Sequence, residues 1–436
     1  MNSTTALHTD HYELTMVQAA MGSGTAFRRS VFELFPRRLP EGRRYGVVAG
    51  VGRALDAIEQ FRFDEPALGW LVDHKIVNDE LAHWLAAYRF TGDVWGYPEG
   101  EIYFPWSPLL RVEGSFAEAC LLETVLLSIY NYDSAVASAA SRMTLMAGDR
   151  PCIEMGSRRT HEASAVAAAR AAYVAGFTST SNLEAGRTHG VPTAGTAAHS
   201  FTLLHDDEEA AFRAQIASLG EATTLLVDTY DVEAAVRKGV ELTGGRLGAV
   251  RLDSGDLAEQ AFDIRDLLDE LGATKTRIIV TSDLDEYQLA ALRGAPVDGY
   301  GVGTSLVTGS GHPTCSFVYK LVARATSDEP DAALYPVEKK SANKATVGGR
   351  KFALRRLNER GVAEAEVIGV GEVPAGDHND RPLLVPLVAG GRVVGREPLT
   401  TARERHAATR AELPRAARKM SAGDPVIPTI VLEEES

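Results

Sequence analysis

Short apolar runs alternate with longer amphipathic segments through the middle of the chain. The runs are rich in β-branched residues and span 152–156, 176–181, 191–196, 223–230, 248–254, 277–283 and 297–303. Several of the segments between them end in glycine, which is the usual residue just beyond a helix C-terminus. Seven strand-then-helix units in succession predict a parallel β-sheet covered by helices.

The number of predicted strands indicates how this sheet is organised. An open doubly wound sheet usually has fewer strands, so the pattern favours an α/β fold with an irregular (β/α) barrel. An eighth strand could come from "TCSFVYKLV" at 314–322 or from the region before residue 117. We therefore expect a barrel with an additional mixed α+β domain built from the N- and C-terminal segments.

The flanking regions lack this regular alternation. Residues 11–21 have helical apolar spacing, and 100–116 is strand-like with prolines that favour a sheet edge. The C-terminal part is strand-rich and then becomes a polar helical tail at 401–420. The predicted domains are an N-terminal mixed α+β region at 1–116, a barrel-like catalytic domain at 117–325 and a C-terminal segment at 326–436. We expect the C-terminal segment to pack with the N-terminal region.

Composition and charge exclude several classes of protein. The chain of 436 residues is too long for one ordinary domain, and its formal net charge of -14 argues against a nucleic-acid binder, which needs a basic face. Three cysteines without metal-site spacing favour a reducing compartment, and the N-terminus lacks a secretory signal pattern. The most apolar helix carries Glu123 and Asp133 and is too polar to span a bilayer. We expect a cytoplasmic protein without membrane contact.

Polar or glycine-rich clusters follow each predicted strand. In a β/α barrel the active site forms at the C-terminal ends of the strands, so these clusters would surround one cavity. Arginine forks suit phosphate or carboxylate, and backbone N–H groups with hydroxyls suit phosphate. The clusters are Arg158-Arg159, Thr180 to Asn182, His199, Asp228 to Asp231, Arg251 to Asp256, Ser282-Asp283 and Gly301 to Ser305. They predict a ligand that resembles a doubly phosphorylated sugar.

Taken singly, these features leave more than one interpretation open. The stretch "GVGTS" at 301–305 is either a phosphate-binding loop or an ordinary turn. Asp253 and Asp256 could hold ribose hydroxyls or a magnesium ion, or cap a helix. His199 follows a run of small residues in "AGTAAHSF", so it either packs in a crowded core or leaves room for a bulky group.

Seven motifs occur in an order that resembles one known family. They are "TDHYELTM" (9–16), "GSRRTHEA" (156–163), "GFTSTSNLEAG" (176–186), "AGTAAHSF" (194–201), "LVDTYDV" (226–232), "VRLDSGDL" (250–257) and "GYGVGTSLVT" (299–308). Together they resemble nicotinate phosphoribosyltransferase, a type II phosphoribosyltransferase, and the similarity extends into "EKKSANKATVGGRKFALRR" (338–356). Each motif is modest alone, but seven in this order are specific.

The resemblance implies a reaction. The family joins nicotinate to the phosphoribosyl group of phosphoribosyl pyrophosphate, releases pyrophosphate, and couples this to ATP hydrolysis through a phosphorylated histidine. His199 matches that histidine, and Asp228 matches the carboxylate that holds its other ring nitrogen. Such a pairing fixes the tautomer and stabilises the imidazolium. Mg²⁺ on the pyrophosphate is the implied electrophile.

The resemblance also implies which residues bind phosphoribosyl pyrophosphate. It places the ribose hydroxyls near Asp253, which would act in catalysis, and the 5-phosphate near the 301–305 loop. The implied substrate contacts in these motifs are Arg251, Ser254, Gly255, Gly303 and Thr304. It leaves open which of Lys339, Lys340 and Lys344 contacts phosphate.

For the pyridine ring, the resemblance implies contacts from two subunits. Arg158 matches the arginine that contacts the acidic substituent, and Met155 stands where a nicotinamide-using relative has a stacking phenylalanine. Tyr12 matches an aromatic that stacks on the ring from the partner subunit, which implies a homodimer. Ser181 stands where the nicotinamide-using relative has an aspartate, whose charge would repel the carboxylate of nicotinate. Serine at this position therefore favours the acid.

Two alternatives remain, one in the same class of enzyme and one in a different class of function. The chain could be a nicotinamide phosphoribosyltransferase, although Ser181 argues against it. It could also be a barrel that binds a phosphosugar without catalysis, as a sensor or scaffold. Such a protein would not need the pairing of His199 with Asp228.

Overall fold

The computed structural model describes residues 4–339 and 346–432. The chain divides into two compact units, one formed by residues 1–138 together with 312–436 and the other by residues 139–311. The long helix α6 (Glu123–Ala147) begins in the first unit and ends in the second. The boundaries expected at 116/117 and 325/326 remain a prediction about folding units.

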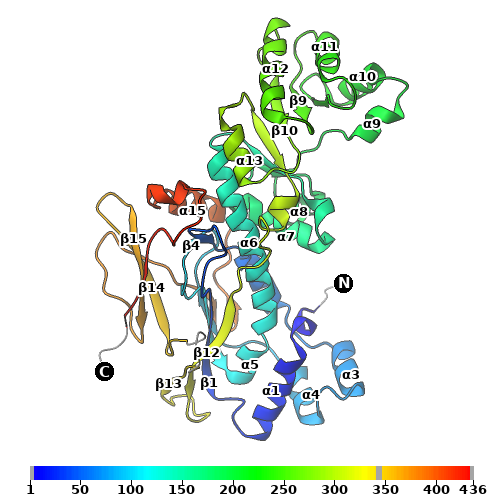
Figure 1. Cartoon of the computed structure of the whole chain (residues 1–436). Helices are drawn as coiled ribbons and strands as arrows, with labels where there is room; N and C mark the ends of the chain where they lie inside the picture. Colours follow the sequence, from blue (N-terminus) through cyan, green and yellow to red (C-terminus); the bar gives the residue numbers. More distant parts are fainter. Residues whose placement is uncertain (1–3, 340–345, 433–436) are drawn as a thin grey trace. The chain divides into compact units, whose positions relative to one another are not determined.

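The second unit contains the expected parallel sheet, but its ring of strands is not closed (Figure 1). The strand order is β7-β6-β11-β10-β9-β8, and every neighbouring pair is parallel. Their bounds are β6 Cys152–Glu154, β7 Ser179–Thr180, β8 Thr224–Leu226, β9 Ala249–Leu252, β10 Arg277–Val280 and β11 Gly299–Val302. Residues 139–311, all of which the structure describes, therefore form a half-barrel with β7 and β8 as edge strands.

Two expectations about the strands are wrong. The run at 191–196 forms no named strand and contributes only an isolated parallel bridge between Thr193 and Thr180. The run at 314–322 does not complete the barrel. It overlaps β12 (Val318–Ala325), which pairs antiparallel with β1 (Arg29–Phe35) in the first unit. The alternation of apolar and helical runs thus predicted most strands but overestimated the closure of the sheet.

Helices cover the parallel sheet of the second unit. Acidic residues cap several of them, and the Asp256 carboxylate accepts hydrogen bonds from the N–H groups of Ala258 and Glu259. Asp256 is therefore a helix N-cap, which was one of its two interpretations. The helices are α7 Glu162–Val174, α8 Leu183–His189, α9 His199–Leu204, α10 Glu208–Leu219, α11 Val232–Leu242, α12 Leu257–Glu270, α13 Glu286–Ala291 and α14 Thr304–Val307.

The first unit is built on an antiparallel sheet of seven strands in the order β13-β12-β1-β5-β3-β17-β18. Three strands from the N-terminal part of the chain form the centre of this sheet and C-terminal strands flank them on both sides, because β12 pairs with β1 and β17 pairs with β3. Its strands, besides β1 and β12, are β3 Asp93–Gly96, β5 Leu110–Ser115, β13 Leu334–Pro336, β17 Val385–Ala389 and β18 Arg392–Val393. The edge position expected for 100–116 is wrong for β5, which has a partner strand on each side, whereas β4 in the same segment pairs only with β2.

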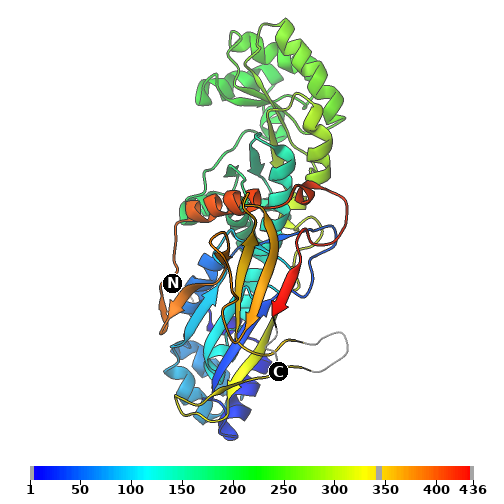
Figure 2. The ribbon, with the colours of Figure 1, turned by 90° about the vertical axis from the view of Figure 1, so that its left-hand side faces the viewer.

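A second, four-stranded sheet of this unit has the order β16-β14-β15-β19. Figure 2 shows β14, β15 and β19 side by side, and β19 runs parallel to β15. A buried ion pair joins its central strands, because Arg355 donates to Glu366 at 2.8 Å and both side chains are fully buried. The strands are β14 Lys351–Leu357, β15 Ala363–Val370, β16 Arg381–Pro382 and β19 Thr429–Leu432, and a small pair consists of β2 Gly46–Val47 and β4 Ile102–Tyr103.

The helices of the first unit include the one expected at 11–21, which is α1 (His11–Gly22). The tail helix is α15 (Leu399–Ala411), and it buries His406. The remaining helices are α2 Val51–Glu59, α3 Glu65–Asp73, α4 Asp79–Ala86 and α5 Phe116–Cys120. In the part of the chain that the structure describes, no helix combines the length and apolarity needed to cross a bilayer.

Candidate active site

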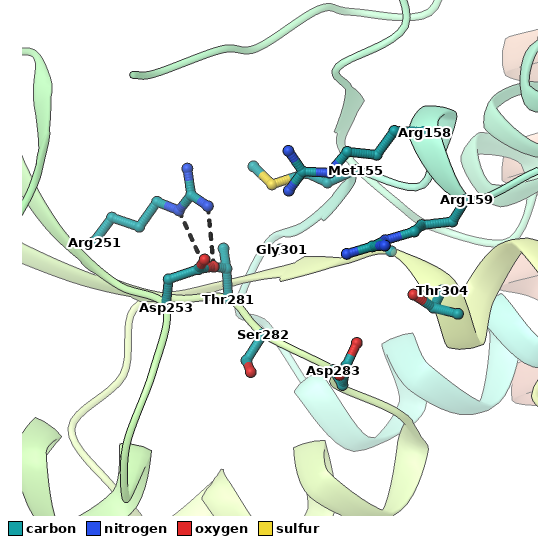
Figure 3. Close-up of a pocket in the computed structure, with 11 residues that line it drawn as sticks. Met155, Arg158, Arg159, Arg251, Asp253, Thr281, Ser282, Asp283, Gly301 and Thr304 are labelled. Carbon is teal, nitrogen blue, oxygen red and sulfur yellow. Dashed lines mark hydrogen bonds and ion pairs between the residues drawn. The ribbon is translucent and has the colours of Figure 1, made fainter. Parts of the chain in front are cut away.

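A pocket of about 230 Å³ lies at the C-terminal ends of four parallel strands of the second unit (Figure 3). Met155 follows β6, Asp253 follows β9, Thr281 follows β10 and Gly303 follows β11. The complete lining is Met155, Arg158, Arg159, Arg251, Asp253, Thr281, Ser282, Asp283, Gly301, Gly303 and Thr304. Residues from four of the polar clusters expected at strand ends thus surround one cavity.

Arg251 connects three segments around this pocket. Its Nε–H donates to Thr281 Oγ1 at 2.9 Å, and Nη2 lies 3.0 Å from Asp253 Oδ1. Its Nη1 donates to Thr196 Oγ1 at 3.2 Å and to the carbonyl oxygen of Ala197 at 3.3 Å. The guanidinium therefore ties the loop that precedes His199 to the ends of β9 and β10.

Asp253 is held by two of the same groups. Its Oδ1 accepts hydrogen bonds from the Thr281 hydroxyl and from Arg251. Burial opposes ionisation, but these donors together hold the pKa of Asp253 below its usual value. Asp253 therefore presents a carboxylate, the form that accepts hydrogen bonds from hydroxyl groups.

Arg158 and Arg159 lie on a single 3₁₀ turn, η2 (Ser157–Arg159), directly after β6. Figure 3 shows Arg159 extending across the pocket and Arg158 running beside Met155. Both arginines are exposed, and neither has an ion-pair partner within residues 4–339 and 346–432. Two guanidinium groups are thus available to an anionic ligand.

Glycine and backbone conformation shape the floor of the pocket. A Cβ atom added at Gly301 would lie 2.5 Å from Thr281 Cγ2 and 2.8 Å from Met155 Sδ, so only glycine fits there. Ser282 has a φ of 126°, a conformation that costs energy for a residue with a side chain. The surrounding structure therefore holds Ser282 in a strained turn at the wall of the pocket.

His199 and Asp228 lie close together outside the lining of this pocket. The Nε2 atom of His199 lies 3.9 Å from Asp228 Oδ1, which is too long for a hydrogen bond, and Nδ1 lies 3.1 Å from Thr229 Oγ1. The His199 side chain is 42% exposed, so it is not the histidine of a crowded core. The side chain of Asp228 is buried, and its Oδ2 accepts hydrogen bonds from the Asp253 N–H at 3.0 Å and the Ser254 hydroxyl at 2.7 Å. The same carboxylate thus faces His199 and holds the start of the loop after β9.

The remaining predicted residues lie apart from the lining of the pocket. Ser181 is exposed and follows β7, and its N–H donates to the carbonyl oxygen of Glu154 at 2.8 Å. Gly255 has a φ of 85°, which suits glycine in the turn after Asp253. Lys339 lies in the first unit, whereas Lys340 and Lys344 lie outside the described residues.

Tyr12 belongs to the first unit, where it lies in the first turn of α1. Its side chain is 43% exposed, which differs from the buried position expected of an ordinary core tyrosine. Burial and the neighbouring carboxylates of Glu123 and Glu13 raise the pKa of Tyr12. Tyr12 is thus partly open to solvent and lies close to two carboxylates.

Two residues of this region are absent from the sequence-based candidates. Thr281 forms hydrogen bonds with both Arg251 and Asp253. In the sequence it lies at the end of an apolar run, where nothing distinguishes it from an ordinary strand residue. Glu154 ends β6 as a fully buried acid, and burial raises its pKa. A carboxylate inside the apolar run "CIEMG" was a usable signal, because acids are rarely buried without a specific partner.

Several known proteins similar to this chain are described as nicotinate phosphoribosyltransferases. The nicotinate phosphoribosyltransferase (NAPRTase) N-terminal domain family matches residues 7–131. Nicotinate phosphoribosyltransferase pncB1 of Mycobacterium tuberculosis (strain CDC 1551 / Oshkosh) is 54% identical over 432 residues, which cover 97% of this chain and 94% of the relative. Nicotinate phosphoribosyltransferase of Bacillus subtilis (strain 168) is 38% identical over 366 residues, with coverage of 81% and 74%.

The fold is similar to that of a solved structure. The crystal structure of human nicotinic acid phosphoribosyltransferase matches with a TM-score of 0.83 and 27% identity, and the match covers 98% of both chains. The α/β architecture with an incomplete parallel barrel and additional antiparallel sheets is therefore one that a solved relative shares along nearly its whole length.

Proposed function

The chain belongs to the nicotinate phosphoribosyltransferase family, and from this premise we propose how the strand-end pocket divides the reaction among its residues. The enzyme transfers the phosphoribosyl group of phosphoribosyl pyrophosphate to nicotinate, which yields nicotinate mononucleotide and pyrophosphate in NAD salvage. The bond between the anomeric carbon and pyrophosphate breaks, and a bond from that carbon to the pyridine nitrogen forms. The protein must therefore hold two anions and a sugar in one cavity.

The observation that carries the assignment of roles is the set of arginines around this cavity. Arg158, Arg159 and Arg251 line the pocket together with the Asp253 and Asp283 carboxylates. We assign Arg251 to phosphoribosyl pyrophosphate and Arg158 to the carboxylate of nicotinate, because a guanidinium fork pairs with either anion. Pairing with the Asp253 carboxylate keeps the Arg251 fork oriented before the substrate arrives.

The ribose phosphate occupies the ends of β9 and β11 in this proposal. Gly303 and Thr304 supply a backbone N–H group and a hydroxyl to the 5-phosphate. The Asp253 carboxylate accepts hydrogen bonds from the ribose hydroxyls, and Ser254 and Gly255 form the adjacent wall. As the bond to pyrophosphate lengthens, the ribose acquires positive charge, which the Asp253 carboxylate stabilises.

Nicotinate is bound between Arg158, Ser181 and Met155, with Tyr12 supplied by a second copy of the chain. Exposure of Tyr12 supports a stacking role, because an aromatic ring that is open to solvent can pack against a planar ligand. We therefore propose a homodimer. Ser181 adds no negative charge near the carboxylate of nicotinate, which favours the acid over the amide.

ATP hydrolysis is coupled to this transfer through a phosphate on His199. The side chain is accessible, and its neighbours in "AGTAAHSF" are small, which leaves space for a phosphoryl group. The γ-phosphoryl group leaves ADP and bonds to a ring nitrogen of His199, and the imidazolium that forms is stabilised by the Asp228 carboxylate. Water later releases this phosphate.

The reaction uses Mg²⁺, which we propose is carried by the pyrophosphate. Within the described residues no group of three or more histidine, cysteine, aspartate or glutamate side chains could hold a metal ion, but Asp253 and Asp283 offer the oxygen donors that Mg²⁺ prefers. When bound, the ion neutralises charge on the leaving group. The three free cysteines are all buried, which is compatible with a reducing compartment, and we propose a cytoplasmic location.

A product assay tests the proposed function. The purified protein is incubated with phosphoribosyl pyrophosphate and Mg²⁺, and with either nicotinate or nicotinamide, each with and without ATP. We expect nicotinate mononucleotide as the main product and a higher rate when ATP is present. Equal rates with nicotinamide would contradict the assigned specificity, and a rate unaffected by ATP would contradict the coupling.

A further inference from the structure

Glu154 is a buried carboxyl group that directly precedes Met155, a residue of the pocket lining. It is the last residue of β6 and is 1% exposed. The Gly156 N–H and the Thr180 hydroxyl donate to its two oxygens, one each. No salt bridge to Glu154 occurs among the described residues. The cost of burying this carboxyl group is therefore offset by these two neutral hydrogen-bond donors.

These contacts belong to a ring that is formed by four hydrogen bonds and closed through the main chain. The Thr180 hydroxyl oxygen accepts from the Asn182 N–H at 2.9 Å, and Asn182 Nδ2 donates to Ser157 Oγ at 3.0 Å. Ser157 is the neighbour of Gly156 in the chain, so the ring returns to Glu154 through the Gly156 N–H. The ring therefore joins the end of β6 to the end of β7.

The two residues assigned to bind the acidic substituent of nicotinate are direct chain neighbours of residues in this ring. Arg158 follows Ser157, and Ser181 lies between Thr180 and Asn182. The N–H of Ser181 also donates to the main-chain oxygen of Glu154 at 2.8 Å. A shift of Glu154 would consequently move Arg158 and Ser181 relative to each other.

The turn after β6 has little freedom to absorb such a shift. A Cβ atom added at Gly156 would lie 2.3 Å from Val307 Cγ1 and 3.0 Å from the carbonyl oxygen of Gly303. The turn is therefore packed against the segment that carries the proposed phosphate-binding residues. On its other side it is held by the Glu154 ring.

We propose that Glu154 is a positioning residue for recognition of the acid. Through Thr180, Asn182 and Ser157 it sets the spacing between Arg158 and Ser181, and so contributes to the preference for nicotinate over nicotinamide. Glu154 touches neither substrate. The proposal rests on the proposed roles of Arg158 and Ser181.

The chemistry of the ring requires two acceptor oxygens at position 154. A glutamine keeps the size of the side chain but replaces one acceptor by an amide donor, and the Thr180 oxygen already accepts from Asn182. Glu154→Gln thus retains one of the two contacts and distorts the other. Thr180→Val and Ser157→Ala interrupt the same ring at two other points, of which Ser157 is partly exposed and its loss costs little folding stability.

Steady-state kinetics of the full chain with each variant test the proposal. For Glu154→Gln and Thr180→Val we expect the KM for nicotinate to rise about tenfold, the KM for phosphoribosyl pyrophosphate to change less than about twofold, and kcat to change less than about threefold. The ratio of kcat/KM for nicotinate to that for nicotinamide falls by a similar factor. Ser157→Ala gives a smaller change in the same direction.

The control is Glu286→Gln, which alters another buried acid of the same unit. Glu286 pairs with Arg142 at 3.0 Å and does not line the pocket. This variant lowers the melting temperature without changing the preference ratio. If the Glu154 and Thr180 variants lose only melting temperature and keep the wild-type KM and preference, Glu154 is merely structural and the proposal is wrong.

Ser181→Asp separates this failure from failure of the proposed function. If Ser181→Asp changes the substrate preference but the Glu154 and Thr180 variants do not, the proposed role of Ser181 is supported and the role of Glu154 is wrong. An unchanged preference in Ser181→Asp overturns the assignment on which both depend.

Discussion

The Nε2 atom of His199 faces Asp228 Oδ1 at 3.9 Å, and that oxygen is buried and accepts no hydrogen bond from the described residues. An unsatisfied carboxylate oxygen in a buried position costs free energy, so a positive charge placed next to it is stabilised. A cationic imidazole ring, whose free nitrogen keeps its proton while the other nitrogen bonds to a phosphoryl group, would provide that charge.

We expect ATP to leave an acid-labile phosphate on the protein, and His199→Ala to remove it. Phosphohistidine is stable at neutral pH and lost in acid, so intact-mass spectrometry at neutral pH detects it as an added phosphate. The control is His205→Ala, which removes the histidine that ends α9 and bonds to the carbonyl oxygen of Phe201. Phosphate that persists in His199→Ala but disappears in His205→Ala would show that the wrong histidine was assigned.

Asp228→Asn tests the carboxylate itself. The amide is almost the same size, and its oxygen can still accept from the Ser254 hydroxyl, but it carries no charge to stabilise the imidazolium. We expect the rate of phosphohistidine formation to fall about tenfold to a hundredfold, measured by quenched incubation with labelled ATP. Asp263→Asn, on the exposed face of α12, is the matched control. Equal phosphorylation rates in the wild type and Asp228→Asn would remove the electrostatic role.

The strand ends were predictable because parallel strands all end on one edge of a sheet. The spacing of Arg251 and Asp253 after an apolar run was enough to place both in one cavity. Closure of the barrel was not predictable in this way. The run at 191–196 is apolar, but its small residues form only the Thr193–Thr180 bridge, and pairing of 318–325 with the distant 29–35 is decided by contacts that local pattern does not contain.

The contacts between side chains at neighbouring strand ends could not be predicted from the sequence either. Thr281 meets Arg251 and Asp253 only because β9 and β10 pair in register, with Val280 opposite Leu252. Glu154 reads as one polar residue in an apolar run, and its ring with Thr180 depends on β6 lying beside β7. The residue types were visible in the sequence, whereas their partners required the fold.

Substrate preference is the next property that one side chain should control. Ser181→Asp places a carboxylate beside the proposed site of the nicotinate carboxylate, and two like charges about 4 Å apart repel by roughly 4 kcal/mol at an effective dielectric near 20. Because Ser181 is exposed, solvent weakens this repulsion, and we expect the nicotinate to nicotinamide preference to fall about tenfold to a hundredfold. Ser181→Ala removes the hydroxyl without adding charge and should change the ratio much less. Kinetics with both substrates measure the ratio, and an equal effect of the two variants would mean that charge does not decide it.

His406 is expected to make the first unit sensitive to acid. It is buried on α15, where Nδ1 lies 3.3 Å from the carbonyl oxygen of Gly100, and Nε2 has no hydrogen-bond partner in the described part of the chain. Burial and the nearby positive charge of Arg410 lower the pKa of His406 from 6.5 to about 3. The unfolded chain therefore binds a proton that the folded chain excludes between these pH values.

The last prediction concerns how the free energy of unfolding changes with pH because of His406. Stability from the neutral ring is present above about pH 6.5 and is lost as the pH falls toward 3, at about 1.4 kcal/mol per pH unit. His406→Gln keeps a side-chain donor for the carbonyl oxygen of Gly100 but does not titrate, so its free energy of unfolding should fall less steeply below pH 6.5. Urea unfolding of wild type and variant between pH 7 and pH 4.5 measures the difference, with His83→Gln on the exposed face of α4 as control. Parallel pH profiles for wild type and His406→Gln would show that the buried ring takes up its proton without unfolding the unit.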